Sequence, residues 1–370
     1  MTLSLEQILD ALATVVDPDQ GKDIVRLGLV KGLRVDGHTV SFTLMLKNPA
    51  APFAQTAADR AREAIHAALG SSVRVNIQVD NEMIGLGDDL TLSGAETPDT
   101  EARPVHVIAV ASGKGGVGKS TVAVNLAVAL ARAGYEVGLV DTDMYGPSIP
   151  TMFGLHDARP RVNEARKIIP IEQHGVKLLS MGFLVDPNKA VIWRGPMVSS
   201  AVKQFLNDTA WGALDFLVMD LPPGTGDIQL TIVQTVALSG AVVVSTPQDV
   251  ALADARKGVA MFEQVNVPVL GIVENMAYFT PPDLPDRRYY LFGEGGARRL
   301  ADELDVPLLA EIPIEQALRE SCDAGTPVVL AAPESASARA FTRMAEAVAR
   351  QTALLAATRP APSDMEISYR

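Results

Sequence analysis

The residues best suited to chemistry are those of GKGGVGKST at residues 113 to 121, which fit the phosphate-binding pattern G-x-x-x-x-G-K-[ST]. Its glycines let the backbone turn tightly and direct N–H groups at phosphate oxygens, and a following helix N-terminus adds partial positive charge. Lys119 is expected to reach the β and γ phosphates of a nucleotide, and Ser120 to ligate Mg²⁺. The predicted nucleotide contacts are Gly113, Lys114, Gly115, Gly116, Val117, Gly118, Lys119, Ser120 and Thr121.

Carboxylates close two apolar segments farther along the chain. Asp141 and Asp143 stand in DTDMYGPSIP, where they could hold Mg²⁺ with its waters and orient an attacking water, or simply form a turn or helix cap. Asp220 ends DFLVMD and precedes LPPGTGD, which indicates a Walker B aspartate followed by a glycine-rich switch loop. Asp227 fits a switch residue and the cap of the next helix equally well.

Two further polar positions have open roles. Asn275 ends VPVLGIVEN, where its side chain could hydrogen-bond an adenine edge or serve only the loop, as could TPQ at 246 to 248. Arg194 lies beside a turn in WRGPM, and a surface salt bridge fits it as well as a functional contact does.

The surrounding pattern predicts the elements that position these residues. VHVIAVAS at 105 to 112 predicts a buried parallel strand, and residues 121 to 134 a helix ending at Gly134. Apolar strands then alternate with helices: EVGLVDTD, VKLLSMG, DFLVMDLPP, AVVVSTPQ, VPVLGIVEN and VPLLAEIP, with a closing helix at 335 to 357. This alternation predicts an α/β fold with a doubly wound, mainly parallel sheet, whose ligand lies beyond the carboxyl ends of the strands.

A smaller α+β domain is predicted before this sheet. Residues 1 to 82 contain a helix (4 to 15), two strands (26 to 36 and 38 to 46), a helix (53 to 68) and a strand (72 to 79). The stretch at 83 to 104 is rich in Gly, Pro, Thr and acidic residues and predicts a linker. The ATPase domain is expected at 105 to 357, followed by a loose tail at 358 to 370.

Composition excludes several classes of protein. The 370 residues are 48% hydrophobic and 21% charged, as in an ordinary globular protein. A formal charge of −12 without any dense basic run argues against a dedicated nucleic-acid binder. The N-terminus carries Glu6 and Asp10 where a signal peptide would be basic, and no apolar run approaches a bilayer span, so a cytoplasmic protein without membrane contact is expected.

With these motifs in view, the segment from residue 104 to about 355 resembles the Mrp family of deviant Walker A ATPases, relatives of MinD, ParA and the nitrogenase iron protein. GKGGVGKST, DTDMYGPSIP, WRGPMV, LDFLVMDLPPGTGD and GIVENM stand in family order. The resemblance implies a homodimer that sandwiches two ATP molecules with Mg²⁺, Lys114 reaching the partner's nucleotide as an arginine finger would. It makes Lys114, Lys119, Asp143 and Asp220 the catalytic candidates, and Ser120 and Asp141 the metal ligands.

The resemblance also implies an iron–sulfur cluster carrier that serves client or assembly proteins, and residues 1 to 82 resemble a small domain of iron–sulfur assembly proteins. A C-x-x-C pair is expected after ENMAYF, but the chain has TPPDLPDRRYYLFGEGG, where Asp283, Asp286, Tyr289 and Tyr290 offer only hard oxygen donors. The small domain often has a cysteine before proline, and here Ala51 precedes Pro52. Cys322 is the only cysteine, so a dimer has two thiolates where an all-cysteine cluster needs about four.

Three functions therefore compete. The favoured hypothesis is a weak Mg²⁺-dependent ATPase in iron–sulfur assembly, with cluster ligands supplied by a partner or by glutathione. A partitioning or positioning ATPase like ParA or MinD would need a basic patch or an amphipathic anchor, which the proline-rich tail does not offer. A redox enzyme like the nitrogenase iron protein would need cysteines near the nucleotide switches, and none occurs there.

Overall fold

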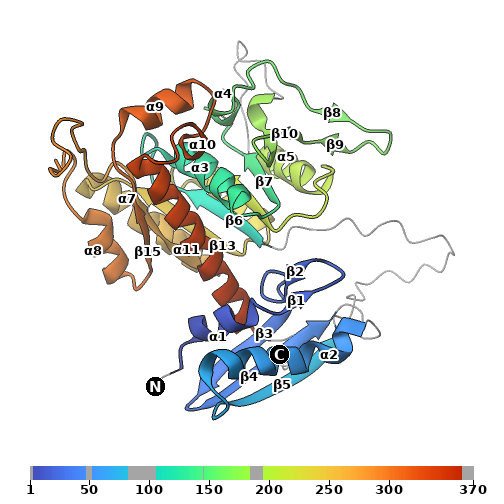
Figure 1. The fold of residues 1–370 in the computed structure, drawn as a ribbon. Coiled ribbons are helices and arrows are strands. Elements are labelled where there is room, and N and C mark those ends of the chain that lie inside the picture. The colour runs from blue at the N-terminus through green and yellow to red at the C-terminus, as the bar shows by residue number, and fades with distance from the viewer. Residues whose placement is uncertain (1–2, 47–51, 82–105, 145, 184–194, 361–370) are drawn as a thin grey trace. The chain divides into compact units, whose positions relative to one another are not determined.

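The computed structural model describes residues 3–46, 52–81, 106–144, 146–183 and 195–360, and the chain forms two compact units (Figure 1). The smaller unit is Met1–Thr100 together with Arg350–Arg370, and the larger unit is Glu101–Ala349. The predicted linker at 83 to 104 and residues 361–370 of the predicted tail lie outside the described residues.

The small unit is an α+β structure built on a three-stranded sheet of order β3-β4-β5. Its elements are α1 (Leu5–Leu12), β1 (Val16–Asp17), β2 (Lys22–Asp23), β3 (Val30–Asp36), β4 (Thr39–Leu46), α2 (Pro52–Leu69) and β5 (Arg74–Asn81). The helix α1 begins with a capping box, in which the side chains of Ser4 and Gln7 each accept the other's backbone N–H. The five predicted elements are confirmed, but the strand expected from residue 26 begins at Val30, because a turn through Gly28, with φ of 66°, comes first.

The last helix, α11 (Ala336–Thr358), is shared between the two units. Ala357 is buried in the core of the small unit, and the backbone N–H of Gly32 donates to the carbonyl of Arg359 at 2.8 Å. The sequence prediction assigned residues 105 to 357 to a single domain, whereas the helix from Arg350 onward clusters with the small unit. Helical periodicity continues unbroken along α11, so the pattern could not show where the helix changes its packing partners.

The large unit is a mainly parallel α/β structure, as predicted. Its sheet has the order β10-β11-β7-β12-β6-β13-β14-β15, and among these strands β10 pairs antiparallel with β11 while the other neighbours pair in parallel. The strands, in this order, are Ile171–Gln173, Val176–Ser180, Val137–Asp141, Phe216–Asp220, His106–Ala111, Gly240–Ser245, Val269–Glu274 and Leu308–Glu311. A separate two-stranded ribbon is formed by β8 (Arg161–Val162) and β9 (Ile168–Ile169).

Helices cover both faces of this sheet. They are α3 (Lys119–Arg132), α4 (Ile149–Met152), the 3₁₀ turn η1 (Met181–Phe183), α5 (Gly195–Asn207), α6 (Asp227–Thr235), α7 (Asp249–Gln264), α8 (Gly296–Glu303), α9 (Gln316–Asp323) and α10 (Val328–Ala331). A core of apolar side chains joins α5, α6, α7 and α8 to one face, while α3 packs on β6, β7 and β12 from the other (Figure 1). The central strands are therefore buried on both faces, which explains their unbroken apolar sequences.

The strand order fixes where a ligand can bind. The strands β6, β7, β12, β13 and β14 run parallel, so their carboxyl ends and the polar residues that follow them share one edge of the sheet. Among the described residues, no helix combines the length and apolar character that a membrane span requires.

Candidate nucleotide-binding site

The predicted phosphate-binding loop joins β6 to α3. Gly116 and Gly118 adopt φ of 81° and 80°, a left-handed conformation that side-chain-bearing residues rarely take. Gly118 is the N-cap of α3, and the hydroxyl of Ser112 donates to the carbonyl of Lys114 at 2.9 Å. The loop therefore presents the N-terminus of α3 and its unpaired N–H groups to an anion.

Gly113 is required by packing as well as by phosphate access. A Cβ at this position would lie 2.2 Å from the backbone carbonyl of Asp254 and 2.7 Å from the nitrogen of Ala255. Both atoms belong to α7, whose backbone cannot yield as a flexible side chain could. The close approach of α7 thus fixes the start of the phosphate-binding loop.

Lys119 and Asp220 form a buried ion pair at the centre of this edge. The ammonium of Lys119 lies 2.6 Å from Oδ1 of Asp220 and 3.2 Å from the hydroxyl of Ser120. Lys119 is 6% exposed and Asp220 is fully buried. Oδ2 of Asp220 has no hydrogen-bond partner among the described residues. The lysine and the hydroxyl of the phosphate-binding loop therefore meet the carboxylate that is predicted to be the Walker B residue.

The carboxylates of Asp141 and Asp143 also lie at this edge. Asp141 accepts the backbone N–H of Asp143 at 3.0 Å and the hydroxyl of Ser180 at 2.9 Å. Asp143 accepts the backbone N–H of Gly146 at 3.3 Å and is 8% exposed. Hydrogen bonds from the backbone N–H (3.0 Å) and hydroxyl (2.8 Å) of Thr142 to the carbonyl of Asp220 tie the two strand ends together.

Burial and nearby charges shift the pKa values of two of these carboxyl groups. Burial and the nearby charge of Asp220 raise the pKa of Asp141 to about 8. Burial also raises the pKa of Asp220, and the Lys119 ammonium opposes that rise. A pKa of about 8 favours a proton on this pair of buried carboxylates at neutral pH, and the Lys119 ammonium bonded to Asp220 favours Asp220 as the charged member.

Asn275 contacts the phosphate-binding loop directly. Its side-chain amide donates to the carbonyl of Val117 at 2.9 Å, and a Cβ on Gly118 would lie 2.2 Å from the same amide nitrogen. The next residue, Met276, has a φ of 56°, which turns the chain away from β14. Asn275 thus supports the phosphate-binding loop through Val117, and its predicted contact with an adenine edge stays a prediction.

Two remaining loop residues have distinct surroundings. Lys114 is half-buried, and its ammonium makes no hydrogen bond or ion pair with any residue that the structure describes.

Thr121 lies beside Cys322 of α9. Burial raises the pKa of the Cys322 thiol, and a hydrogen bond with the side chain of Thr121 offsets part of that rise. The fold thus places the single cysteine beside the nucleotide edge, which its sequence position did not indicate.

The described residues contain no group of three or more His, Cys, Asp or Glu side chains that could hold a metal by themselves. They do contain hard oxygen donors in the hydroxyl of Ser120, the buried carboxyl of Asp141 and the unpartnered Oδ2 of Asp220. Mg²⁺ typically uses one or two carboxylates together with substrate phosphates. This donor set fits Mg²⁺ that arrives with a nucleotide.

Family comparison agrees with this geometry. The family described as NUBPL iron-transfer P-loop NTPase matches residues 103–349, which is more than half of the chain. The chain belongs to this family. The description "iron-sulfur cluster assembly protein" matches residues 5–79, so the resemblance of both segments to iron–sulfur proteins is confirmed.

Relatives of this P-loop NTPase match nearly the whole chain in some cases and about two thirds of it in others. It is 47% identical over 365 residues to an iron-sulfur cluster carrier protein of Synechocystis sp., covering 96% of this chain and 99% of that protein. It is 51% identical over 246 residues to the iron-sulfur cluster carrier protein of Escherichia coli, covering 66% of each chain.

Solved structures support the predicted fold class. The nucleotide-binding protein of Archaeoglobus fulgidus in complex with ADP is similar, with 42% identity and a TM-score of 0.56, covering 64% of this chain and 92% of that one. The Pyrococcus furiosus cell division ATPase MinD is also similar, with 26% identity and a TM-score of 0.51, covering 66% of this chain and 98% of that one.

Three further positions of the sequence analysis lie outside the described residues or have a different local role from the one predicted. Arg194 and Ala51 fall outside them. Asp227 is exposed as the first residue of α6, and Gly226, rather than Asp227, is the N-cap. The interpretation of Asp227 as the cap is therefore wrong, although its charge still favours the positive end of the helix.

The sequence analysis missed side chains that hold the predicted carboxylates in place. Ser180 ends β11 and lies opposite Asp141 in the sheet register, which no local pattern reveals. Thr142 stands between Asp141 and Asp143. Because successive side chains of a strand point to opposite faces, the sequence DTD could have suggested that Thr142 contacts a different strand end from the two aspartates.

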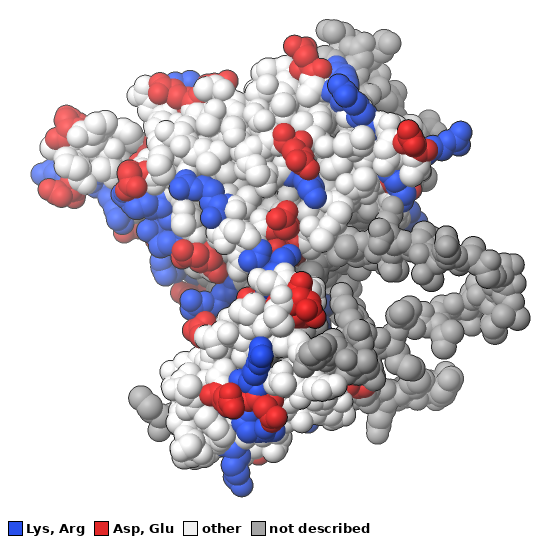
Figure 2. All heavy atoms as spheres, turned by 45° about the vertical axis from the view of Figure 1, so that its right-hand side comes forward, with Lys and Arg blue, Asp and Glu red and all other residues white. Residues whose placement is uncertain are grey.

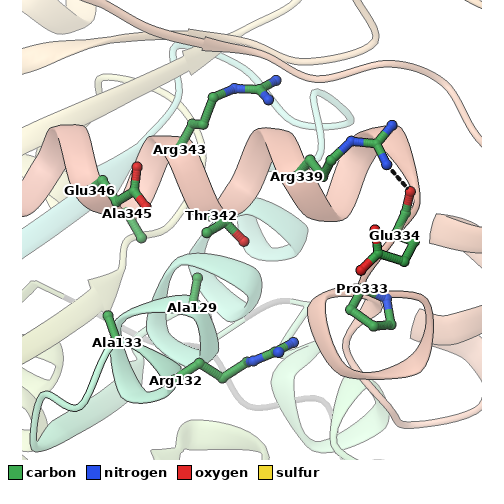
Figure 3. A pocket seen from close by; sticks show the side chains of 10 residues that line it. All are labelled: Ala129, Arg132, Ala133, Pro333, Glu334, Arg339, Thr342, Arg343, Ala345 and Glu346. Carbon is green, nitrogen blue, oxygen red and sulfur yellow. Dashed lines mark hydrogen bonds between the residues drawn. The ribbon is translucent and has the colours of Figure 1, made fainter.

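The NTPase also has a cavity of about 530 Å³ between the end of α3 and α11, lined by Arg132, Arg339 and Arg343 among others (Figure 3). Arg132 donates to the carbonyl of Val329, and Arg339 to the carbonyl of Glu334. The cavity adjoins the last turn of the 14-residue helix α3, so it lies about 20 Å from the phosphate-binding end. It is therefore not part of the nucleotide site.

Gly113→Ala is expected to weaken binding of Mg²⁺–ATP at least about tenfold, because the added methyl must displace the backbone of α7 or the loop. Gly258→Ala is the matched control on α7, since a Cβ there meets no atom within 4 Å. The control should keep its affinity in isothermal titration calorimetry. Equal affinities for the two variants would show that α7 does not fix the loop.

Asp141→Asn is expected to reduce the pH dependence of stability. A carboxyl with a pKa of about 8 in the folded protein and 3.8 when unfolded binds more protons when folded, so the free energy of unfolding falls as pH rises between these values. From pH 5 to 9 the wild type should lose at least about 1 kcal/mol more than the variant.

Fluorescence of Trp193 and Trp211, the chain's two tryptophans, reports unfolding of the large unit in this test. Asp227→Asn, which neutralises an exposed carboxylate, is the control and should follow the wild type. Identical pH profiles for wild type and Asp141→Asn would contradict the assignment of the proton to Asp141.

Proposed function

We propose that this protein binds and hydrolyses ATP with Mg²⁺ as a homodimer in the cytoplasm, and that it carries iron–sulfur clusters to apoproteins. The observation that carries the proposal is the buried pair of Lys119 and Asp220 at a phosphate-binding loop, in a chain whose relatives are named iron-sulfur cluster carrier proteins. The ADP complex of the Archaeoglobus relative supports nucleotide binding at this loop.

Before a nucleotide binds, the Lys119 ammonium is already held at the phosphate-binding loop by Asp220. The Lys119 ammonium exchanges Asp220 for the β and γ phosphates, and the N–H groups of the loop surround the remaining oxygens. Ser120 and Asp141 would hold Mg²⁺, with the Asp220 carboxylate as a further acceptor beside them. When bound, Mg²⁺ would neutralise charge that develops on the phosphates. Asp141 would give up its proton on binding, because a cation nearby favours the carboxylate.

Hydrolysis then depends on positioning a water molecule and on stabilising charge. Asp143 is held at this edge by Gly146 and is proposed to orient the attacking water toward the γ-phosphate. Lys114 is proposed to act on the nucleotide of a second subunit, which agrees with its lack of any ion-pair partner among the described residues. An ammonium that enters from another subunit stabilises the transferring phosphoryl group only in the dimer.

The cluster is cargo rather than a resident cofactor. The protein has one thiol per chain, and burial raises the pKa of that thiol, so it is a poor ligand at neutral pH. Ligands from glutathione or from a client protein therefore complete the coordination of the cluster. The N-terminal unit, which matches iron–sulfur cluster assembly proteins, supports a role in this process.

A partitioning or positioning ATPase of the MinD or ParA type is less well supported. The similarity to MinD extends over the large unit's fold, and fold alone does not carry function. Figure 2 shows basic and acidic side chains on the same face, and the formal net charge of −12 disfavours a nucleoid-binding role. The match of residues 5–79 instead favours iron–sulfur assembly.

Lys119→Ala tests nucleotide binding. Loss of the ammonium leaves the phosphates poorly compensated and Asp220 buried without its partner, so ATP affinity should fall at least about 100-fold. Lys203→Ala, which removes an exposed lysine of α5, should bind ATP as the wild type does. Calorimetry in Mg²⁺ that finds unchanged affinity in Lys119→Ala would refute the role assigned to this loop.

Mixing Lys114→Ala with Asp143→Ala tests action across the dimer. Each variant alone should lose turnover more than ATP affinity. In a heterodimer, one composite site carries both lesions and the other carries neither, so ATPase activity should partly return. A lack of recovery in heterodimers confirmed by differential tagging would argue that Lys114 acts within its own chain.

Anaerobic reconstitution tests the cargo hypothesis. Without added thiols, desalted protein should retain little iron and show no broad absorption near roughly 400 nm, because two thiolates per dimer cannot replace about four. With glutathione or an apoprotein present, iron should be retained or transferred. A cluster that is stable without added thiols and survives Cys322→Ser would contradict this account, whereas one lost on that substitution would place Cys322 among the ligands.

A further inference from the structure

The cavity of about 530 Å³ between the end of α3 and α11, which we term the arginine cavity, lies away from the nucleotide edge (Figure 3). Small side chains leave this space between the two helices, namely Ala129 and Ala133 on the α3 side and Ala345 on α11. Thr342 points from α11 toward α3, and its hydroxyl donates to the carbonyl of Ala338 at 3.0 Å. The volume falls within the range of about 300–1,000 Å³ that is typical of small-molecule sites.

Three guanidinium groups line the arginine cavity. Arg132 comes from the last turn of α3, and Arg339 and Arg343 come from successive turns of α11. Arg132 donates to the carbonyl of Val329 and Arg339 to the carbonyl of Glu334, and a guanidinium has further N–H donors beyond one such bond. In the part of the chain that the structure describes, none of the three forms an ion pair with a carboxylate.

This concentration of positive charge is unfavourable unless an anion offsets it. Arg339 and Arg343 are four positions apart on one helix, a spacing at which like charges destabilise the helix. Planar carboxylates match the geometry of a guanidinium and accept two parallel N–H groups from it. The three arginines therefore favour a ligand that carries carboxylates.

Two acidic side chains restrict the ligand further. Glu334 and Glu346 lie toward opposite ends of the arginine cavity, and neither forms an ion pair within the described ranges (Figure 3). Both carboxylates repel a purely anionic ligand and attract an ammonium group. Three arginines and two glutamates leave the lining with one net positive charge. A complementary ligand therefore carries more than one carboxylate, together with an ammonium group.

We propose that the arginine cavity binds a short acidic peptide with two carboxylates and a free ammonium group, a class to which glutathione belongs. The guanidinium groups hold the two carboxylates, and a glutamate accepts the ammonium group. The inference rests on the proposed function in one respect, since glutathione is one of the proposed sources of ligands for the cargo cluster. It deepens that function by giving the peptide a site on the protein.

The affinity at this site is expected to be low. All five charged side chains of the arginine cavity are exposed, so water and salt screen each contact. A dissociation constant of about 1 mM follows if each of four such contacts contributes at the upper end of the range for exposed ion pairs.

A saturation-transfer NMR titration of the full chain, without nucleotide or iron, measures binding of glutathione, S-methylglutathione and citrate. S-methylglutathione keeps the charged groups but cannot form a disulfide with Cys322, so it should bind within about twofold of glutathione. Arg339→Gln should raise the dissociation constant of both peptides at least about fivefold. Arg161→Gln, which removes an exposed arginine of β8, is the matched control and should bind as the wild type does.

The double variant Glu334→Gln/Glu346→Gln tests the requirement for an ammonium group. It should weaken glutathione binding at least about threefold and strengthen citrate binding by a similar factor, because citrate has no ammonium group. Thr342→Trp, which fills the space between the helices, should abolish binding of both ligands. Each variant should keep the ATP affinity of the wild type in calorimetry, since the arginine cavity lies about 20 Å from the phosphate-binding loop.

The absence of saturable binding by either peptide would overturn the proposal, and so would an affinity that Arg339→Gln and Thr342→Trp both leave unchanged. Tighter binding of glutathione as well as citrate to the double glutamate variant would also overturn it, because it would identify a site for simple anions. Failure of the proposed function has a different signature. A protein that binds no ATP but binds glutathione through Arg339 supports the arginine cavity and refutes the ATPase.

Discussion

The buried ion pair between Lys119 and Asp220 is the interaction on which the rest of the large unit depends. Neither charge is tolerable alone in the interior, because desolvation of an unpaired ion costs several kcal/mol. The pair forms only if β6 and β12 are neighbours, with Asp220 opposite Val110, and if the loop between β6 and α3 turns tightly enough to bring Lys119 back. Strand order and loop conformation are thereby linked to one 2.6 Å contact.

The same pair explains why this edge is suited to a phosphate with its metal. The buried carboxylates of Asp141 and Asp220 lie near one buried lysine, and a proton on Asp141 limits their mutual repulsion. In the proposed binding step a polyphosphate would take the Lys119 ammonium from Asp220, and its divalent cation would compensate the carboxylates left behind.

Three consecutive residues connect this site to more distant parts of the unit. Asn275 holds the phosphate-binding loop through Val117, and Met276 turns the chain into the segment 277–295 that leads to α8. Glu274 accepts the backbone N–H of Ala297 at 2.5 Å at the start of α8, and burial raises the pKa of its carboxyl. The phosphate-binding loop and the start of α8 are thus connected through one short stretch of chain at the end of β14.

The sequence by itself determined the fold class and predicted most of the candidate site, because both depend on local signals. Glycine spacing specifies the loop at residues 113 to 121, unbroken apolar runs specify buried parallel strands, and a carboxylate at the end of such a run marks Asp220. Only the tertiary structure decided which strand ends become neighbours. It brought Ser180 to Asp141, Asp254 against Gly113, Cys322 beside Thr121, and the end of α11 onto the small unit. These contacts join residues far apart in the chain, so they depend on strand order and helix packing, which no local period of the sequence records.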